Sequence, residues 1–372
     1  MRTSFYVHLL TGSLVLSSAL MFSAPASAGY KVAETEDFTL ELGLRLQPRL
    51  EYQRVPNGGE FVRDFLVRRS RWKANGKMKK ALYVFEWRID TTDGALTSPV
   101  IGLENGYITY PVGAGIDLRM GIYDQPFSRD LLTSDSKQLV VDRGAVSAYP
   151  SALGLADNAV GIQAMGKVRG GRAQYAVGVF DNRTIVLVPA PPAGSPARQP
   201  VPMVVGRLDL NLSSTKDVFQ DAHFGDERWF SIGVNGSYQG ELENVAGADG
   251  GSRGAAGIDG MADVPLGPGR LLVRSEFNVI EATAPTGGNS LDTRVWMAGA
   301  GFLLFDQRVQ PVVRFDQTLP DDAARIESRN TTYAGINFYK KQHNLKLQAD
   351  VRFDSGTGDS VDGGRIQAQV DF

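Results

Sequence analysis

Four cationic side chains stand close together in the stretch FLVRRSRWKANGK, residues 65–77: Arg68, Arg69, Arg71 and Lys73. The large apolar residues between them favour a β-strand. A strand buried on both faces could not hold these cations, because burying an unpaired charge costs several kcal/mol. Arginine keeps its charge and can bind two oxygens of a phosphate or carboxylate at once. The stretch therefore predicts a sheet with a wet face that can bind anions.

A second group of charges lies in residues 124–157, a connection too long for a simple turn. Its apolar residues Phe127, Leu131, Leu132 and Val140 could dock it on a neighbouring surface. We expect a loop that folds inward and narrows a pore; a loop folded over the mouth of the pore is the alternative. Its charged residues include Arg129, Asp130, Asp135, Lys137, Asp142 and Arg143.

The segments that must position these charges alternate with period two. In FTLELGLRLQ, residues 38–47, every second residue is apolar and the others are mostly polar or charged. This alternation is typical of a strand with one apolar and one polar face. About sixteen segments of roughly ten residues show the pattern, and ten residues is the length of a tilted strand that crosses a membrane.

Short and long connections also alternate along the chain. Outer-membrane barrels have this arrangement, with tight periplasmic turns and larger external loops. The connection at residues 213–228 is longer than the other short turns. The fold class expected is all-β: a transmembrane antiparallel β-barrel of about 16 strands with one long constriction loop, because closure leaves no unpaired strand edge in lipid. A soluble β-sandwich is the alternative, but so many strands would need two cores.

The N-terminus differs from the rest of the chain. Residues 1–28 have the composition of a secretory signal, with Arg2, an apolar run from Leu9 to Phe22, and small residues ending at Ala28. A buried N-terminal helix is the alternative. Residues 29–36 are then a short N-terminal periplasmic segment, and residues 37–372 are the barrel domain. Together these segments predict a location in the cell outer membrane, with outer-membrane lipid around the barrel.

Composition excludes several classes of protein. The chain has 39 Lys and Arg against 41 Asp and Glu, whereas a protein that binds nucleic acid is usually basic. It has no cysteine, which excludes disulfides and thiolate metal sites. His223 and His343 fall in expected periplasmic turns, where we expect them to be solvated. We therefore expect neither an enzyme nor a cofactor, with a loose Ser–His–acid set as the alternative.

Basic and acidic residues are about equally frequent on the parity that would line the pore. An ion preference must then come from a local cluster, because distant charges are screened by salt. The basic positions are Arg45, Arg49, Lys80, Arg88, Arg119, Lys167, Arg207, Arg274, Arg314, Lys346, Arg352 and Arg365. The acidic positions are Glu41, Glu51, Glu86, Asp90, Asp117, Asp209, Asp259, Glu276, Asp316, Asp350, Asp354 and Asp371.

Several of these segments resemble one known family over most of the chain after the signal. The stretches are FTLELGLRLQ, RRSRWKANGK, GLENGYITY, GIYDQPFSRDLLTS followed by Asp142-Arg143, and AGINFYKKQHNLKLQADV. In this order they resemble the phosphate-selective porin family, the porins O and P of Gram-negative outer membranes. The resemblance implies a sixteen-stranded barrel, usually a homotrimer, that passes phosphate or related small anions through a narrow basic zone.

The resemblance also suggests roles for individual residues. Arg45 matches the arginine of the first strand, Arg68 and Arg69 match the paired arginines, and Glu104 matches the acidic residue near the site. Lys137 matches the lysine of the constriction loop, with Arg143 nearby. With the cations of the strands and the long loop, the complete candidate site for anions is Arg45, Arg68, Arg69, Arg71, Glu104, Arg119, Arg129, Lys137 and Arg143.

One departure from the family concerns its fifth external loop, which carries a run of arginines in the phosphate-specific members. Here that loop is QGELENVAGADGGSRGAAG, and Arg253 is its only cation. We therefore expect passive diffusion of small solutes with a mild anion preference. Two alternatives remain: a general porin for uncharged or mixed solutes, and a barrel that acts as partner of another envelope protein through residues 213–228.

Overall fold

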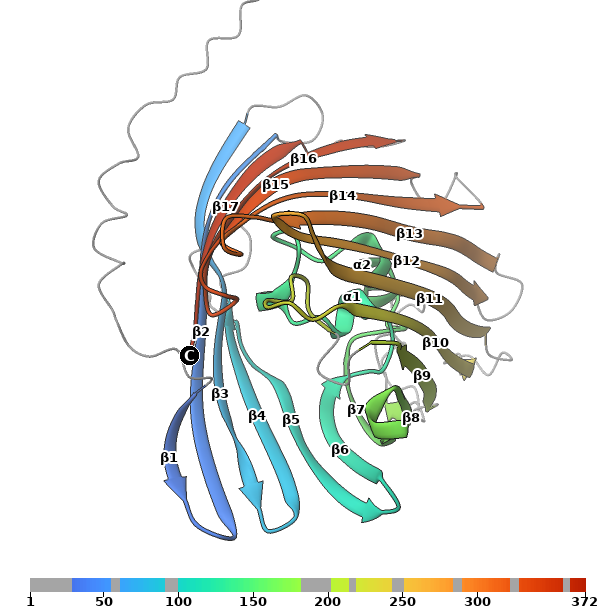
Figure 1. The fold of residues 1–372 in the computed structure, drawn as a ribbon. Coiled ribbons are helices and arrows are strands. Elements are labelled where there is room, and N and C mark those ends of the chain that lie inside the picture. The colour runs from blue at the N-terminus through green and yellow to red at the C-terminus, as the bar shows by residue number, and fades with distance from the viewer. Residues whose placement is uncertain are drawn as a thin grey trace, which may run out of the picture.

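The computed structural model describes residues 29–54, 61–90, 100–181, 202–213, 219–242, 251–283, 290–321, 328–356 and 362–372. The expected secretory signal, residues 1–28, lies outside the described residues, so the structure does not bear on that expectation. Most of the described chain consists of antiparallel β-strands joined in one sheet (Figure 1).

The strands follow the chain in order. The first nine are β1 (Tyr30–Glu34), β2 (Phe38–Arg54), β3 (Phe61–Met78), β4 (Ala81–Asp90), β5 (Val100–Gly113), β6 (Ile116–Asp124), β7 (Asn158–Val168), β8 (Ala173–Asp181) and β9 (Met203–Asn211). The others are β10 (Trp229–Leu242), β11 (Gly251–Leu266), β12 (Gly269–Thr283), β13 (Ser290–Leu303), β14 (Val309–Pro320), β15 (Arg329–Lys341), β16 (Leu345–Gly356) and β17 (Gly363–Asp371).

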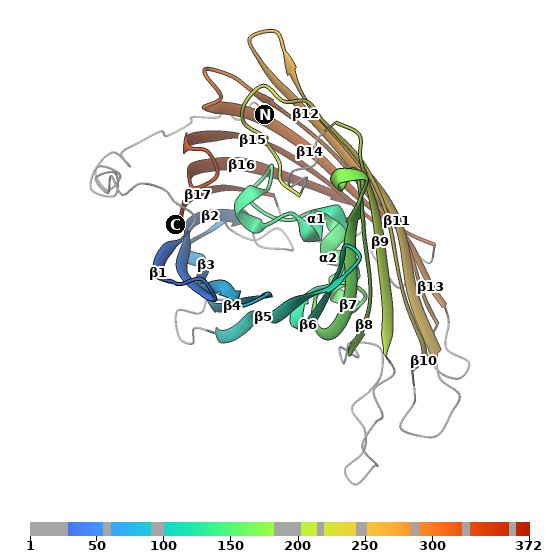
Figure 2. The same ribbon diagram turned by 60° about the horizontal axis from the view of Figure 1, so that its bottom comes forward.

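Strands β2 to β17 form a closed barrel, because each pairs with its neighbour in sequence and β17 pairs with β2. The closing pair places Asp371 opposite Arg45. The short strand β1 adds to β2 alone, with Tyr30 opposite Leu42, and stands outside the ring of sixteen. Figure 2 looks toward the interior, where the connection between β6 and β7 lies inside the ring of strands. The expected number of strands and their closure are confirmed.

The two faces of the barrel differ in polarity as the period-two pattern predicts. On β2, Leu42, Leu46 and Leu50 point outward and are 45%, 38% and 44% exposed. Between them, Arg49 points inward and is only 2% exposed. Because the apolar side chains face outward along strand after strand, the outer surface suits lipid rather than water.

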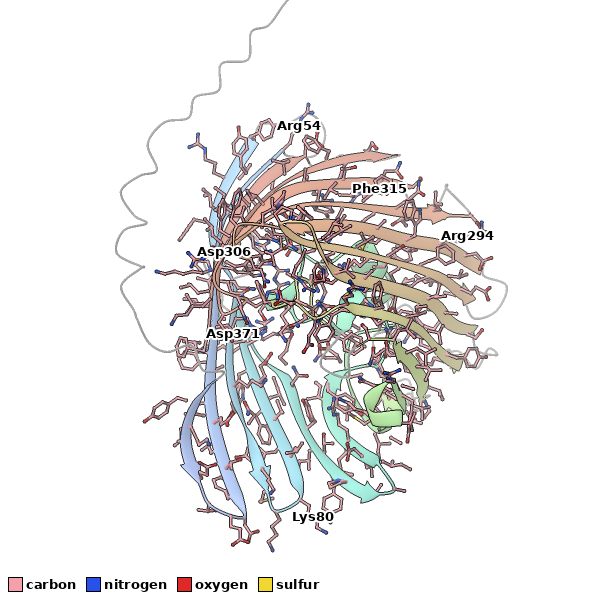
Figure 3. All side chains as sticks on the ribbon, viewed as in Figure 1. Arg54, Lys80, Arg294, Asp306, Phe315 and Asp371 are labelled. Atoms are coloured by element: carbon pink, nitrogen blue, oxygen red, sulfur yellow. The ribbon has the colours of Figure 1, made fainter. Side chains whose placement is uncertain are left out.

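The ends of the barrel can be told apart by their connections. Lys79 and Lys80 alone join β3 to β4, and Figure 3 shows Lys80 at one end of the barrel and Arg54 at the other. Short turns gather at the end near Lys80, which we identify as the periplasmic end, and long connections gather at the end near Arg54. None of the helices in the described part of the chain is long and apolar enough to span a membrane.

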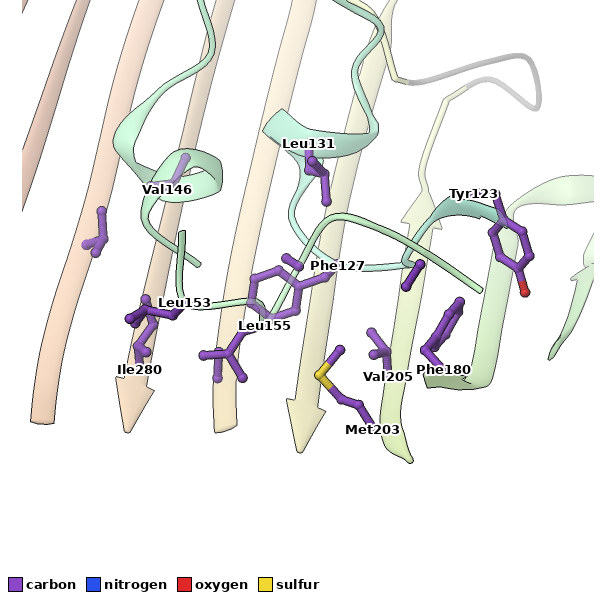
Figure 4. Packing of buried hydrophobic residues seen from close by; sticks show 14 of the residues in the cluster. Tyr123, Phe127, Leu131, Val146, Leu153, Leu155, Phe180, Met203, Val205 and Ile280 are labelled. Atoms are coloured by element: carbon purple, nitrogen blue, oxygen red, sulfur yellow. The ribbon is translucent and has the colours of Figure 1, made fainter. Parts of the chain in front are cut away.

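The connection between β6 and β7 folds into the barrel, as expected for a constriction loop. It contains the helices α1 (Arg129–Leu132) and α2 (Ala145–Ala152) and the 3-10 helix η1 (Asp135–Lys137). Apolar residues of the loop pack on the inner wall, where Phe127 and Leu155 are fully buried in a cluster with Met203 and Ile280 (Figure 4). This cluster keeps the loop inside the lumen, so the alternative of a loop over the mouth is wrong.

A second segment also enters the barrel, from the periplasmic end. Residues 219–228 lead into β10, and Asp221 and Ala222 are each 1% exposed. The Asp221 amide donates a hydrogen bond to the Lys137 carbonyl oxygen over 2.8 Å, and the Asp221 carboxylate accepts one from the Leu139 amide over 2.7 Å. The described part of this turn is therefore packed against the constriction loop, which leaves the docking role considered above without support.

The prediction that both turn histidines are solvated is wrong. His223 is 1% exposed, stacks on Trp229 with ring centroids 4.0 Å apart, and has its Nδ1 3.1 Å from Asp263 Oδ2. His343 is 6% exposed, and its Nε2 lies 3.0 Å from the Ala222 carbonyl oxygen. The physical reason is the inward path of residues 219–228, which brings Phe224 and Ala222 against His343 and brings His223 against Trp229.

Candidate permeation site

The paired arginines lie at an irregularity in the pairing of β2 with β3. Gln47 is opposite Arg69 and Pro48 is opposite Val67, so Arg68 has no partner residue on β2. An extra residue of this kind is a β-bulge, and it changes which face the following side chains occupy. Leu66 and Arg69 are both buried inside the barrel because of this change of parity. The bulge allows both arginines to reach the constriction loop.

The two arginines differ in how they are held. Arg69 is buried, and its Nε lies 2.8 Å from Asp135 Oδ2. Arg68 is the more open of the pair, with 36% of its side chain exposed, and its nearest acidic contact is Asp142 Oδ1 at 3.9 Å. A hydrogen-bonded ion pair requires a shorter distance, so Arg68 keeps a guanidinium that can bind a passing anion.

Arg71 and Glu104 form the next layer of the same wall. Arg71 Nη2 is 3.5 Å from Glu104 Oε1, and Arg71 Nε is 4.0 Å from Glu86 Oε1. Glu104 also accepts from Arg88 Nη1 over 3.2 Å. Glu104 thus lies beside the arginines of β3 and β4, and its carboxylate offsets much of their charge.

Two carboxylates of the constriction loop hold this cluster together. Asp142 accepts from Arg49 Nη2 over 2.8 Å and from Arg365 Nη1 over 2.6 Å. Burial raises the pKa of Asp142, but the guanidinium groups of Arg365, Arg49 and Arg69 outweigh burial and hold it well below its usual range. The pKa of Asp135 is lowered in the same way. Burial raises this pKa, but the guanidinium groups of Arg143 and Arg69 lower it by more than burial raises it. Both loop acids stay ionised at neutral pH.

The constriction-loop cations flank these acids. Arg143 Nη1 lies 3.1 Å from Asp135 Oδ1 in an ion pair, and Nη2 donates to the Leu131 carbonyl over 3.0 Å. Lys137 ends η1 and is half-buried. We use the name constriction site for the group of Arg68, Arg69, Arg71, Glu104, Asp135, Asp142 and Arg143.

Arg45 lies opposite Arg71 of the constriction site, on the strand that closes the barrel. Its Nε donates to Asp371 Oδ2 over 2.9 Å, across the junction of β2 and β17. It is half-buried, with 18% of its side chain exposed. Arg45 therefore lies on the pore wall, but the Asp371 carboxylate offsets most of its charge.

Arg119 occupies a different setting on β6. Its guanidinium lies 4.3 Å from the centre of the Tyr107 ring and 5.4 Å from that of Tyr123. Its Nε donates to Thr109 Oγ1 over 3.2 Å. Among the residues that the structure describes, no carboxylate forms an ion pair with it. Aromatic rings hold an arginine in place without neutralising it, so Arg119 presents its charge to a cavity of about 370 Å³ that Lys167 and Tyr175 also line.

A family model matches this part of the chain. Residues 41–191 match the model for phosphate-selective porin O and P, which includes the constriction loop and the arginines of β3. The match bears out the resemblance that the sequence motifs show. The chain is an outer-membrane porin. Since porins are channels, the expectation that it is not an enzyme is also confirmed. No curated protein matches the sequence.

The fold of the porin is similar to that of solved outer-membrane channels. An anion-selective porin from Comamonas acidovorans has 14% identity and a TM-score of 0.61, over 90% of this chain and all of its own. DcaP of Acinetobacter baumannii has 11% identity and a TM-score of 0.59, over 93% of this chain and all of its own. OmpT of Vibrio cholerae in a trimer form has 10% identity and a TM-score of 0.58, over 91% of this chain and all of its own. At these identities the likeness establishes the barrel fold.

Not every predicted site residue of the porin lies at the constriction site. Arg129 is 2% exposed, and its Nε donates to Asp259 Oδ1 on β11 over 2.6 Å. It therefore anchors the loop to the opposite wall. Arg253, the cation of the fifth external loop, is 3% exposed and donates to the Leu153 carbonyl and to Gln239. The described residues of that loop thus supply no open arginine.

Two residues with a clear role were absent from the sequence-based site. Arg49 and Arg365 both bind Asp142, although they come from opposite ends of the chain. The period-two pattern places both on the pore wall, which was the available signal. What the sequence lacks is the register of β17 on β2, which sets Arg365 opposite Glu51 and two residues from the position opposite Arg49.

Proposed function

We propose that the porin allows passive diffusion of small solutes with a mild preference for anions. The observation that carries this proposal is the difference in pairing among the cations of the lumen. Arg68 and Arg119 lack a close carboxylate among the described residues, whereas Asp135 and Asp142 are each held by arginines. An open guanidinium attracts anions, while a neutralised carboxylate repels them little.

The proposal includes the assembly and the export of the chain. One of the similar structures is a trimer form of OmpT, and the resemblance to porins O and P implies the same state, so we propose a homotrimer. We further propose that residues 1–28 direct export through the periplasm before insertion into the outer membrane.

Reversal potentials in a KCl gradient across a planar bilayer test the anion preference. We expect chloride to be favoured in the wild type, and the potential to move toward zero in Arg68→Ala and in Arg119→Ala. Arg294→Ala is a matched control, because Arg294 is 57% exposed at the end of β13 and loses the same charge outside the lumen. A cation preference in the wild type would overturn the proposal.

The alternative of a general porin for uncharged or mixed solutes rests on the same ion pairs. Most lumen arginines are neutralised, as in Arg314 with Asp316 at 3.0 Å and Arg207 with Asp209 at 2.6 Å. Titration of the chloride current with inorganic phosphate separates the two functions. Block at millimolar phosphate would favour phosphate recognition, whereas a current unaffected by phosphate, with equal passage of K⁺ and Cl⁻, would favour the general porin.

A further inference from the structure

One face of α2 breaks the polar pattern of the lumen. Val146, Ser147 and Pro150 of this helix are buried toward the wall, with Ser147 Oγ donating to Asp130 Oδ2 over 2.6 Å. The opposite face is apolar and looks into a cavity of about 610 Å³. That face consists of Ala145, Ala148, Tyr149 and Ala152.

The apolar face follows from helical spacing, since residues separated by three, four and seven positions share one side of a helix. Ala148 and Ala152 are exposed, and Tyr149 is half-buried with its hydroxyl 3.2 Å from Thr293 Oγ1. Exposed apolar side chains are unusual on the wall of a water-filled channel, where many of the inward positions carry charges or amides and the apolar ones are covered by the constriction loop. This face therefore offers contact area to an apolar group.

The other wall of the cavity is cationic. Strands β15 to β17 contribute Arg329, Arg352, Arg365 and Tyr333, and the constriction loop contributes Arg143. Arg352 binds Asp354 through Nε and Nη2, over 2.9 and 2.6 Å. Its Nη1 has no hydrogen-bond partner in the described part of the chain, and 25% of the Arg352 side chain is exposed. A donor is thus open toward the cavity.

The acids of the cavity are already engaged. Asp316 is paired with Arg314 and also accepts from the Ala145 amide over 3.3 Å. Asp142 is shared by Arg49 and Arg365. The cavity therefore combines an apolar side with an open guanidinium donor on Arg352, and its volume is within the range of ligand sites, roughly 300–1,000 Å³.

We propose that this cavity is a subsite for small organic anions that carry an apolar body, with aromatic monocarboxylates as the best fit. The carboxylate lies toward Arg352, and the ring lies on Tyr149 and Ala148. Arg143 and Asp142 belong to both the cavity and the constriction site, so a solute held here is next to the narrow zone. The proposal rests on the proposed anion preference and names the substrate class that goes with it.

Two simpler compounds distinguish the contributions of the two walls of the cavity. Acetate carries the carboxylate without the ring, and benzyl alcohol carries the ring without the charge. Each uses one wall of the cavity only. Benzoate uses both, because a charge-assisted hydrogen bond from Arg352 and a ring contact can form together across the same cavity.

Block of the chloride current in planar bilayers by these three compounds tests the proposal. We expect benzoate to block at a concentration about tenfold lower than acetate, as one added ring contact can give. Benzyl alcohol should block least. Benzoate no more effective than acetate would overturn the subsite. A reversal potential measured in the same bilayers reports the anion preference independently, so preserved anion preference with equal block would reject the subsite alone.

Variants locate the effect. Tyr149→Ala should weaken block by benzoate and leave block by acetate unchanged, while Tyr149→Phe should retain block by benzoate. Arg352→Gln should weaken block by benzoate and leave benzyl alcohol unchanged. Arg294→Gln at the rim is the control and should change neither. Equal losses for benzoate and acetate in Tyr149→Ala would mean that the ring is not in contact with the solute, and would overturn the proposal.

Discussion

Arg68 and Arg69, which are neighbours on β3, have different roles because the bulge gives them different partners. Arg69 is 6% exposed and bound to Asp135 over 2.8 Å, whereas Arg68 is open. Arg69 therefore holds the constriction loop, and Arg68 is the arginine that we propose meets the solute.

Replacing each of these arginines with alanine should affect a different property. Arg69→Ala should lower the free energy of unfolding by about 2 kcal/mol, since it removes the ion pair with the buried Asp135 carboxylate and the hydrogen bond to Gln47. Arg68→Ala should change stability little. Urea unfolding in detergent micelles measures the free energy of unfolding of both variants. The folded and unfolded barrels are told apart by their different mobility in gel electrophoresis. Equal destabilisation by the two would contradict the division of roles.

The two acids of the constriction loop, Asp135 and Asp142, should stay ionised well below neutral pH. Folding holds the pKa of Asp142 and Asp135 below the ordinary carboxyl range, so their stabilising ion pairs are complete above about pH 4 and are lost as the pH falls through the lowered values. Asp142→Asn removes one of these charges and should increase the anion preference. We expect the resulting shift in reversal potential to be the same at pH 7 and at about pH 5. A shift that disappears between these pH values would contradict this assignment.

The turn of residues 219–228 supports the constriction loop from the periplasmic side. The Asp221 carboxylate accepts from the Leu139 amide and pairs with Arg274 Nη1 at 2.9 Å. Arg274 also pairs with Asp130 of α1, so one buried network joins the turn, the barrel wall and the loop.

Asp221→Ala should release the constriction loop. The change leaves the Leu139 amide without its acceptor and Arg274 with one fewer partner, which we expect to cost about 3 kcal/mol. Open-channel noise should rise and the anion preference should fall, as measured in single-channel recordings. Asp226→Ala is the matched control, because Asp226 is an exposed acid in the same turn. Identical recordings from both variants would show that the turn does not position the loop.

For the whole molecule, the apolar outer face makes one substitution especially costly. Leu208 lies near the middle of β9, points outward and is 43% exposed. Leu208→Arg should destabilise the barrel in lipid vesicles by about 2–4 kcal/mol, the cost of a cation near the bilayer midplane. Leu208→Ile should have little effect. Unfolding in urea in the presence of vesicles measures the difference, and a neutral Leu208→Arg would place β9 outside the membrane.

The sequence was sufficient for the barrel because the period-two pattern acts on each strand separately. Leu42, Leu46 and Leu50 alternate with Gly43, Gln47 and Glu51 whatever the rest of the chain does. The constriction site needed more, since Arg365 reaches Asp142 only through the register of β17 on β2.

Two further features lay beyond the sequence for similar reasons. The bulge at Arg68 comes from a pairing shift opposite Pro48; the residue pattern of β3 is compatible with a bulge at the paired arginines but does not decide it. The burial of His223 and His343 depends on residues 219–228 turning inward, and that path is set by contacts with Leu139 and Arg274, far away along the chain.

The closing pair of strands also governs the order of folding. Arg45 and Asp371 are 326 residues apart, so joining them carries the largest loop-closure entropy in the barrel. Until β17 arrives, that edge of β2 presents unpaired backbone groups, and β1 covers only the part from Thr39 to Leu42. The remaining edge is where an assembly factor would have to protect the nascent chain. Formation of the Arg45–Asp371 ion pair therefore marks the moment at which the barrel is complete.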